Sequence, residues 1–305
     1  MGAVPNRAKG ICEKFHKLGI FGGTRGAGRS ISMRIRVGLH FRELGLYAPR
    51  ILVTFSAVPQ ETLLVIPCYR ERDRLPRFLP RLVESLSHSR LPVKVLIVDD
   101  GSGEEQQAWL KLWVGDLQRR YPILLPPICN PVNQGKGAAV YTGWNTADDT
   151  TAWVGFVDAD GAISPEEVLR VLRHYSDAQG GAVWAVRTGE EETLVRRMFK
   201  RKVSGAVFRK LVARLFHFPV PDTQCGFKLV RTEVYRKIAP QLTEMHYCFD
   251  IDLTFHLLQA GQQIAAVPIS WEESPDSRLG AHSVLAMLRS VLGLKRRLGN
   301  WSDRA

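Results

Sequence analysis

From residue 61 onward, short runs of apolar residues alternate with longer segments in which apolar residues recur every three or four positions. The short runs predict buried strands and the longer segments predict amphipathic helices. The clearest helical segment has its apolar residues at offsets 0, 3, 4, 7, 8 and 11, namely Leu75, Phe78, Leu79, Leu82, Val83 and Leu86. This alternation is typical of an α/β fold in which helices cover both faces of a mostly parallel sheet.

Five strands are predicted in this part of the chain, at residues 63–66, 93–98, 123–129, 152–157 and 182–186. Pro67 is expected to end the first strand because proline has no N–H to donate to a neighbouring strand. The helix after the second strand is expected to turn four apolar residues inward, Trp109, Leu112, Trp113 and Leu117. A further helix is predicted to start at Ser164-Pro165, where a serine cap precedes a proline and two glutamates.

Two later segments, 193–218 and 281–298, combine apolar positions at helical spacing with many lysines and arginines. Such helices pack on a sheet with their charges in solvent, or they lie in a membrane interface. The sequence leaves both interpretations open. Both interpretations predict amphipathic helices in the C-terminal part of the chain, in addition to the sheet and its covering helices.

Charge is unevenly distributed along the chain. The formal net charge is +12, and residues 1–60 carry ten basic residues against two acidic ones. A strongly basic protein favours polyanionic partners such as anionic lipid, phosphorylated substrates or nucleic acid. We therefore divide the chain into a basic and poorly ordered extension at 1–60, a main domain at 61–280, and a C-terminal helix and tail at 281–305.

The five cysteines are odd in number, far apart and never arranged as a CxxC pair, so a disulfide framework or zinc site is not indicated. No apolar stretch approaches the roughly 20 residues of a membrane-spanning helix, and no apolar region follows the N-terminal charges as in a secretory signal. We therefore expect a cytoplasmic protein that is either soluble or peripheral on the cytoplasmic face of a membrane.

The strongest local chemical signal is Asp158-Ala159-Asp160, which directly follows an apolar strand. Two neighbouring carboxylates repel each other, and a divalent cation relieves that repulsion. Taken alone, the pair is equally well explained as a solvent-exposed acidic loop. Its neighbours change this assessment, because further polar clusters also follow strands: Tyr69-Arg70-Glu71, Asp99-Asp100-Gly101-Ser102 and Gly135-Lys136-Gly137. Ligands of such sheets bind beyond the carboxyl ends of the strands, so the clusters should converge.

In this order, the clusters resemble the nucleotide-sugar half of family 2 inverting glycosyltransferases with the GT-A fold, a Rossmann-like architecture. The resemblance implies that a nucleotide sugar contacts Pro67, Tyr69, Glu71, Asp99, Asp100, Lys136, Asp158, Ala159 and Asp160. It also implies that Asp158 and Asp160 hold Mg²⁺ or Mn²⁺ with the diphosphate. A glycine-flanked lysine before a helix independently suits an anion, although a surface lysine in a helix-start turn is an equally good interpretation.

The second half of the chain narrows the resemblance. Asp222-Thr223-Gln224-Cys225-Gly226-Phe227-Lys228, followed by Phe249-Asp250-Ile251-Asp252 and Trp271-Glu272-Glu273, is similar to dolichyl-phosphate β-glucosyltransferases and their prokaryotic polyprenyl-phosphate relatives. This implies hexose transfer, glucose from UDP-glucose in the first instance, to a polyprenyl or dolichyl phosphate. Asp160, Asp222 and Lys228 are the implied catalytic residues. One departure is that the eukaryotic enzymes carry an N-terminal spanning helix, whereas residues 1–60 here are basic and glycine-rich.

The implied acceptor sets the demands on the site. A phosphate monoester has a second pKa of about 6 and is already an anionic nucleophile at neutral pH, so no general base is required. The protein must instead offset repulsion between that phosphate and the donor diphosphate with cations. The resemblance places this acceptor-phosphate role on Arg187, Arg197, Lys200, Arg201 and Ser204, each of which is also compatible with a solvent-exposed surface position.

Two alternative functions would involve partners other than a polyprenyl phosphate. A GT-A enzyme with a sugar, lipid or protein hydroxyl as acceptor would require a base, for which Asp222, Asp250 and Asp252 are candidates. A nucleic-acid-binding protein would use the basic extension, but no aromatic-and-basic RNA platform or zinc module accompanies it. We therefore expect a nucleotide sugar, a polyprenyl phosphate and an anionic membrane surface as partners, and no nucleic acid. The sequence fixes neither the sugar nor the oligomeric state.

Overall fold

The computed structural model describes residues 61–174, 180–187, 199–272 and 281–299, and for 199–207 and 281–285 it describes the helical backbone alone. All of these residues belong to one compact unit, Val58–Ala305. The predicted basic extension at 1–60 lies outside the described residues. Residues 281–299, which the sequence reading sets apart from the main domain, lie in the same unit as the sheet.

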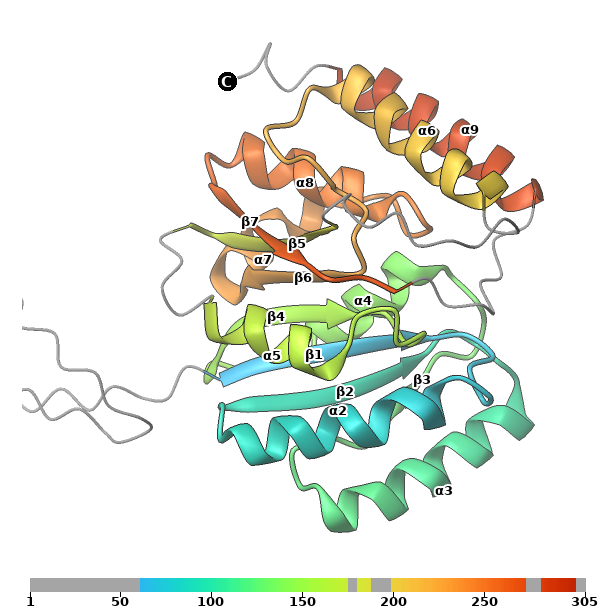
Figure 1. Cartoon of the computed structure of the whole chain (residues 1–305), viewed down its shortest axis with the longest axis vertical. Coiled ribbons are helices and arrows are strands. Elements are labelled where there is room, and N and C mark those ends of the chain that lie inside the picture. The colour runs from blue at the N-terminus through green and yellow to red at the C-terminus, as the bar shows by residue number, and fades with distance from the viewer. Residues whose placement is uncertain (1–60, 175–179, 188–198, 273–280, 300–305) are drawn as a thin grey trace, which may run out of the picture. The chain divides into compact units, whose positions relative to one another are not determined.

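Strands and helices alternate along the chain as the sequence predicts (Figure 1). The strands are β1 (Glu61–Cys68), β2 (Val93–Asp99), β3 (Ile128–Cys129), β4 (Thr151–Val157), β5 (Ala182–Arg187), β6 (Phe227–Arg231) and β7 (Ile264–Ile269). The helices are α2 (Leu75–Ser89), α3 (Glu104–Arg120), α4 (Lys136–Trp144), α5 (Pro165–His174), α6 (Phe199–Phe216), α7 (Thr232–Ile238), α8 (Phe249–Gln259) and α9 (Ala281–Leu298), with a short 3-10 turn, η2 (Ala239–Gln241).

The seven strands form one sheet in the order β3-β2-β1-β4-β6-β5-β7. Every neighbouring pair is parallel except the two pairs that include β6, which runs against β4 and β5. Because β6 is reversed, its first residue, Phe227, pairs with the last residue of β4, Val157. The segment that precedes β6 therefore meets the segment that follows β4.

The strand order reverses between β1 and β4, and the two strands separate there. Their pairing ends at Val65 and Phe156, whereas β1 continues beside β2 as far as Cys68. Pro67 lies past the last β1–β4 pair, where β4 no longer needs an N–H donor from it. The prediction that Pro67 stops the strand after residue 66 is therefore wrong, because β1 continues for two more residues, to Cys68. The opening beyond this point is where α/β sheets bind ligands.

Both faces of the sheet are buried, as expected for a mostly parallel sheet covered by helices. Leu64 and Ile66 of β1 join a cluster with α2, α3 and α5, and Leu63 and Val65 join a cluster with α4, α7 and α8 on the other face. All six apolar positions of the predicted stripe in α2 are buried. The predicted cap of α5 is confirmed, because the Glu167 N–H donates to Ser164 Oγ at 3.3 Å.

Two predicted elements differ from the structure. In α3 the buried residues are Leu110 and Val114, while Leu112 is 75% exposed, so its predicted inward position is wrong. Trp109 and Trp113 are only partly buried and stack on each other with ring centroids 5.2 Å apart. The predicted third strand is also shorter than expected: β3 has two residues, and upstream of it only a single bridge joins Leu124 to Val95.

The C-terminal helices pack together instead of presenting both apolar stripes to solvent. In Figure 1, α6 and α9 lie side by side next to α8. Their contact is a third apolar cluster that includes Phe208, Val212 and Phe216 of α6 and Val291 and Leu294 of α9. Of the two interpretations that the sequence leaves open, Val291 follows the packing one, because its side chain is fully buried in this cluster. Leu292, one residue on, is 50% exposed.

Candidate active site

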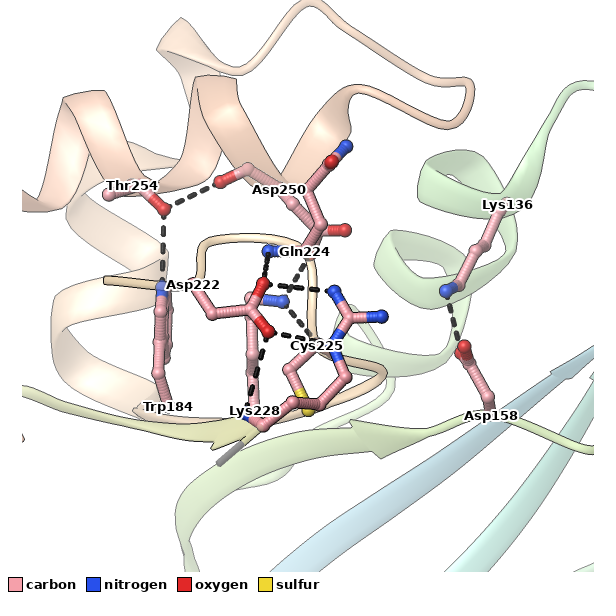
Figure 2. Close-up of polar contacts among 10 residues, drawn as sticks. Lys136, Asp158, Trp184, Asp222, Gln224, Cys225, Lys228, Asp250 and Thr254 are labelled. Carbon is pink, nitrogen blue, oxygen red and sulfur yellow. Dashed lines mark hydrogen bonds and ion pairs between the residues drawn. The ribbon is translucent and has the colours of Figure 1, made fainter. Parts of the chain in front are cut away.

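The loops that carry the predicted donor-binding residues gather at the carboxyl ends of β1, β2 and β4, together with the start of α4. Figure 2 shows Lys136 reaching from α4 to Asp158 at the end of β4, with Asp222, Lys228 and Asp250 brought in from the second half of the chain. Lys136 Nζ lies 2.6 Å from Asp158 Oδ1. The convergence predicted from strand ends thus produces one polar cluster.

Asp158 is fixed by the segment that precedes β6. Its N–H donates to the carbonyl of Gly226 at 2.9 Å. A Cβ on Gly226 would lie 2.3 Å from Asp158 Oδ2, so only glycine allows this approach. The sequence could not reveal this contact, because the two residues are distant in the chain and meet only through the reversed direction of β6.

Asp160 accepts a hydrogen bond from the N–H of Ala162 at 3.0 Å. Burial, and then the negative charge of Asp158, raise the pKa of the Asp160 carboxyl. Between the two acids, Ala159 is buried in the core. Within the described residues there is no cluster of three or more possible protein ligands for a metal.

Two carboxylates without a third protein ligand still fit Mg²⁺ or Mn²⁺. Magnesium is usually held by one or two carboxylates together with substrate phosphates and water. Burial and the neighbouring charge of Asp158 both disfavour the ionised form of Asp160 and raise its pKa, and a bound cation would favour that ionised form. Asp158 and Asp160 are therefore suitable ligands for a divalent ion bound together with a diphosphate.

The turn that carries Lys136 is held from two sides. Asp100 accepts the N–H groups of Gln134 and Gly135 at 3.0 and 2.8 Å. On the opposite side, the N–H of Ala138 donates to the carbonyl of Met245 at 3.0 Å. Gly135 has a φ of +109°, and a Cβ there would lie 2.4 Å from the same carbonyl, so the turn requires glycine.

The charge on Lys136 is stabilised by its surroundings. Burial disfavours the ammonium, but the carboxylates of Asp158 and Asp250 outweigh it and raise the pKa of Lys136. The ammonium also lies 5.1 Å from the centre of the Phe156 ring, a distance suited to a cation–π contact. Lys136 is thus a fixed cation next to the predicted metal ligands.

Asp99 and Asp100 are both buried, and both hold neighbouring backbone. Asp99 accepts hydrogen bonds from the N–H of Ser102 and from Gln107 Nε2, each at 2.9 Å. The hydroxyl of Ser102 links this loop to the loop after β1, because it accepts a hydrogen bond from the N–H of Arg70 at 2.7 Å. These carboxylates shape the loops after β1 and β2, and their predicted contacts with base and ribose stay a prediction.

The loop after β1 contains the other predicted nucleotide contacts. Tyr69 is 38% exposed, and the guanidinium of Arg70 lies over its ring, 5.1 Å from the centre. Arg70 has a φ of +56°, a left-handed conformation that is uncommon for a residue with a side chain. Glu71 forms a two-point ion pair with Arg74 at the start of α2. Pro67 stands just before this loop.

On the opposite side of Asp158, Arg187 and Asp222 form a two-point ion pair. Arg187 Nε and Nη2 donate to the two oxygens of Asp222 at 2.7 and 3.0 Å. Although burial raises the pKa of Asp222, its hydrogen bonds and charge pairing with Arg187 outweigh that effect and lower it. The Trp271 ring covers the guanidinium of Arg187, with 5.5 Å between them. The sequence placed these residues at the site but did not predict that they pair.

Lys228 is completely buried. Its predicted catalytic role did not lead us to expect this. Its ammonium lies 2.7 Å from Asp250 Oδ1 and donates to the carbonyl of Cys225 at 2.6 Å. It lies over the rings of Phe156 and Trp184, at 5.2 and 5.5 Å from their centres. Lys228 contacts protein groups on all sides, so it supports the 222–226 segment from below (Figure 2).

Asp252 is also buried and fixes a loop. It accepts the N–H groups of Thr243 and Glu244 at 2.8 and 2.9 Å and lies 3.3 Å from His256 Nε2. Because Met245 follows directly, Asp252 anchors the loop that contacts the Lys136 turn. Among the acceptor-phosphate candidates besides Arg187, Lys200, Arg201 and Ser204 lie in α6 where side chains are not described, and Arg197 lies outside the described residues.

Comparison with known proteins adds the following. Residues 63–239 match the family model described as glycosyl transferase family 2. A dolichyl-phosphate beta-glucosyltransferase from Dictyostelium discoideum is 27% identical over 79% of this chain and 76% of its own length. A polyprenol monophosphomannose synthase from Mycolicibacterium smegmatis is 30% identical over 70% of this chain and 78% of its own length.

A solved structure of similar fold is glucosyl-3-phosphoglycerate synthase from Mycobacterium tuberculosis, crystallised with Mg²⁺ and uridine diphosphate. It has a TM-score of 0.57 and 16% sequence identity, and the match covers 79% of this chain and 80% of that one. Of the residues described here, no helix combines the length and the hydrophobicity needed to cross a lipid bilayer.

Proposed function

Because the chain belongs to glycosyl transferase family 2, with the GT-A fold, we propose that it transfers a hexose from a nucleotide sugar to the phosphate of a polyprenyl phosphate, with inversion at the anomeric carbon. Similarity to a dolichyl-phosphate glucosyltransferase and a polyprenol monophosphomannose synthase supports the acceptor class. Glucose from UDP-glucose is the first donor to test, because several relatives are dolichyl-phosphate beta-glucosyltransferases.

One observation favours a phosphate over a hydroxyl as acceptor. The three carboxylates that are the candidate bases are all paired among the described residues: Asp222 with Arg187, Asp250 with Lys228, and Asp252 with two backbone N–H groups and His256. A hydroxyl acceptor must lose a proton during attack, whereas a phosphate monoester is already ionised above its second pKa of about 6. The site therefore suits an acceptor that brings its own nucleophilic oxygen.

On the donor side, Asp158 and Asp160 would hold a divalent ion, which supplies charge neutralisation of the diphosphate leaving group. The structural relative with Mg²⁺ and uridine diphosphate supports this type of site. Lys136 adds a fixed cation next to these acids, and Tyr69 offers an exposed ring to the base. Asp99 and Asp100 keep the surrounding loops in place, and Pro67, Glu71 and Ala159 remain proposed contacts of the nucleotide sugar.

On the acceptor side, Arg187 would receive the phosphate while Asp222 and Trp271 keep its guanidinium oriented. We assign Asp222 to this positioning role instead of proton transfer. Arg197, Lys200, Arg201 and Ser204 remain proposed contacts of the same phosphate. Lys228 acts through Asp250 and the carbonyl of Cys225, so it is a positioning residue as well.

A lipid acceptor requires the protein to reach a membrane. We propose peripheral attachment to an anionic cytoplasmic surface, supported by the net charge of +12 and by the exposed Leu292 and arginines of α9. Juxtamembrane cations contribute about 1 kcal/mol each. The attachment surface is narrower than the whole stripe 281–298, since Val291 and Leu294 pack against α6 and α8.

The decisive experiment is a transfer assay with purified protein, a polyprenyl phosphate and three labelled donors: UDP-glucose, UDP-N-acetylglucosamine and GDP-mannose. We expect a labelled lipid product with one donor, dependent on Mg²⁺ or Mn²⁺. The same assay with a polyprenol, which lacks the phosphate, should give no product. Equal transfer to polyprenol and to polyprenyl phosphate would refute the proposed acceptor.

A further inference from the structure

The segment 243–248 lies directly against the turn that carries Lys136. The carbonyl of Met245 accepts the N–H of Ala138 at 3.0 Å. This N–H belongs to the first turn of α4, where the helix itself supplies no acceptor. A Cβ on Gly135 would lie 2.4 Å from the same carbonyl, so backbone meets backbone with no side chain between them. The position of the Met245 carbonyl therefore helps to set the position of the turn.

On its other side, the 243–248 segment is tied to helix α9. Ser290 Oγ donates a hydrogen bond to Glu244 Oε2 at 2.6 Å. The second oxygen of this carboxylate, Oε1, accepts the N–H of His246 at 3.1 Å. The carboxylate of Glu244 thus connects a side chain of α9 to the peptide group that joins Met245 to His246.

That peptide group is held at both of its polar ends. Its carbonyl, from Met245, binds the N–H of Ala138, and its N–H, from His246, binds Glu244. Because a peptide group is planar, a partner that fixes the direction of the N–H also fixes the direction of the carbonyl. A charged acceptor forms the stronger kind of hydrogen bond. The Glu244 carboxylate therefore restrains the carbonyl that holds the start of α4.

We propose that Glu244 is a positioning residue of the donor site: held by Ser290, it orients the peptide group that fixes the turn of Lys136. The inference rests on the proposed function, because it takes Lys136 as a cation of the donor site. It adds a role for α9, the helix of the proposed membrane attachment, which braces the donor side of the site through one hydrogen bond.

The ends of the 243–248 segment are held by groups other than the Glu244 side chain. Asp252 accepts the backbone N–H groups of Thr243 and Glu244 at 2.8 and 2.9 Å. At the other end, Cys248 is buried, and its Sγ lies 3.6 Å from the carbonyl of Met287 in α9. Loss of the Glu244 carboxylate should therefore change the alignment of the peptide group and leave the fold intact.

The test measures binding of UDP and of GDP, each with Mg²⁺, by titration calorimetry. Glu244→Ala removes the carboxylate, and Ser290→Ala removes its partner on α9. Ser87→Ala is the matched control, because the hydroxyl of Ser87 in α2 makes no hydrogen bond within the described part of the chain. For the nucleotide that the wild type binds, we expect Ser290→Ala to raise Kd about fivefold and Glu244→Ala about tenfold. Ser87→Ala should change it less than twofold.

A double variant shows whether the two side chains act through one contact. If Ser290 acts only through Glu244, the double alanine variant should bind no more weakly than Glu244→Ala alone. In the transfer assay, both single variants should raise the donor KM and leave the acceptor KM within twofold of the wild-type value. An equal rise of the acceptor KM, or a double variant that shows the product of the two single effects, would contradict the proposed role.

The same measurements separate this inference from the proposed function. If the wild type binds a nucleotide while Glu244→Ala and Ser290→Ala both match Ser87→Ala within twofold, Glu244 does not position the donor site and the proposed function stands. If the wild type binds neither UDP nor GDP in the presence of Mg²⁺, the proposed donor site fails and this inference fails with it.

Discussion

At Gly226, the backbone of the second half of the chain lies against Asp158 with no room for a side chain. We predict that Gly226→Ala lowers kcat at least tenfold, because the added methyl group displaces the carboxylate that would hold the metal. Gly115→Ala is the matched control: nothing lies within 4 Å of its added Cβ, and alanine stabilises a helix interior by about 1 kcal/mol relative to glycine. Wild-type activity of Gly226→Ala in the transfer assay would contradict the proposed role of this contact.

Asp160 is expected to show opposite effects on activity and stability. Its pKa is raised in the folded protein, so its ionised form is disfavoured by folding and costs stability once the pH exceeds its ordinary value near 3.8. Asp160→Asn should therefore keep or increase the unfolding temperature of the metal-free protein at pH 7, while it lowers transfer at least 100-fold. Adding Mg²⁺ with UDP should raise the unfolding temperature of the wild type only.

A matched variant separates this result from a general effect of charge. Asp149→Asn removes an exposed carboxylate far from the metal ligands, and we expect normal transfer and a normal response to Mg²⁺ with UDP. If Asp160→Asn also keeps its activity, or if the wild type transfers sugar in excess chelator, Asp160 does not hold a catalytic metal.

The pKa of Asp222 is shifted in the opposite direction to that of Asp160. Because the pKa of its carboxyl is lowered in the folded protein, ionised Asp222 stabilises the fold above pH 4, and this contribution is lost as the pH falls through the lowered value. Asp222→Asn leaves Arg187 without its partner and should cost about 3 kcal/mol at pH 7. The difference in unfolding free energy between wild type and variant, measured in urea, should narrow below pH 4. If the difference in unfolding free energy between wild type and variant stays constant below pH 4, the ion pair of Asp222 with Arg187 is not its cause.

At the scale of elements, the sequence predicts strongly patterned segments well and weakly patterned ones less well. The stripe in α2 is confirmed at every position because its six apolar residues leave a single possible inner face. In α3 the prediction is wrong only for Leu112, because Trp109, Trp113 and Leu117 are partly buried and pack against the core. The fully buried residues of this helix are Leu110 and Val114, which the pattern did not single out.

The apolar stripe of α9 was ambiguous for a related reason: apolar residues that pack on another helix and those that contact lipid have the same spacing. We predict that Val291→Ser costs about 3 kcal/mol of unfolding free energy, because it places a hydroxyl in a filled apolar cluster. Leu292→Ser, one residue away and half exposed, should leave stability within 0.5 kcal/mol. It should weaken binding to anionic liposomes. A larger loss of stability for Leu292→Ser than for Val291→Ser would contradict the packing of α9.

For the whole molecule, the sequence predicted which residues gather at the site but not how they are paired. Strand ends of a parallel sheet meet at one edge, so Asp99, Lys136 and Asp158 could be brought together by pattern alone. The ion pairs of Lys228 with Asp250 and of Arg187 with Asp222 depend on strand order and on the reversed β6, which a periodic pattern does not encode. An ionisable side chain inside the apolar run of β6 was the one available signal for Lys228.

Net charge is a property of the whole chain, and we predict that it governs membrane attachment. The protein should sediment with liposomes that contain anionic lipid and far less with neutral ones, because its charge of +12 attracts only the former. About 0.5 M salt should release most of it, since screening at that concentration is nearly complete beyond a few ångströms. Attachment that resists this salt concentration, or that occurs equally on neutral liposomes, would point to apolar insertion or to a partner protein.

The reversed direction of β6 bears on how enzymes of this architecture change substrates in evolution. The proposed donor contacts follow β1, β2 and β4, whereas the proposed acceptor contacts on α6 and the 222–226 segment belong to one later stretch that runs directly into β6. That stretch ends at a strand whose pairing with β4 is fixed by backbone hydrogen bonds. Replacing residues 199–225 with those of a relative should therefore change the proposed acceptor contacts and spare the proposed donor contacts, provided that Gly226 is kept against Asp158.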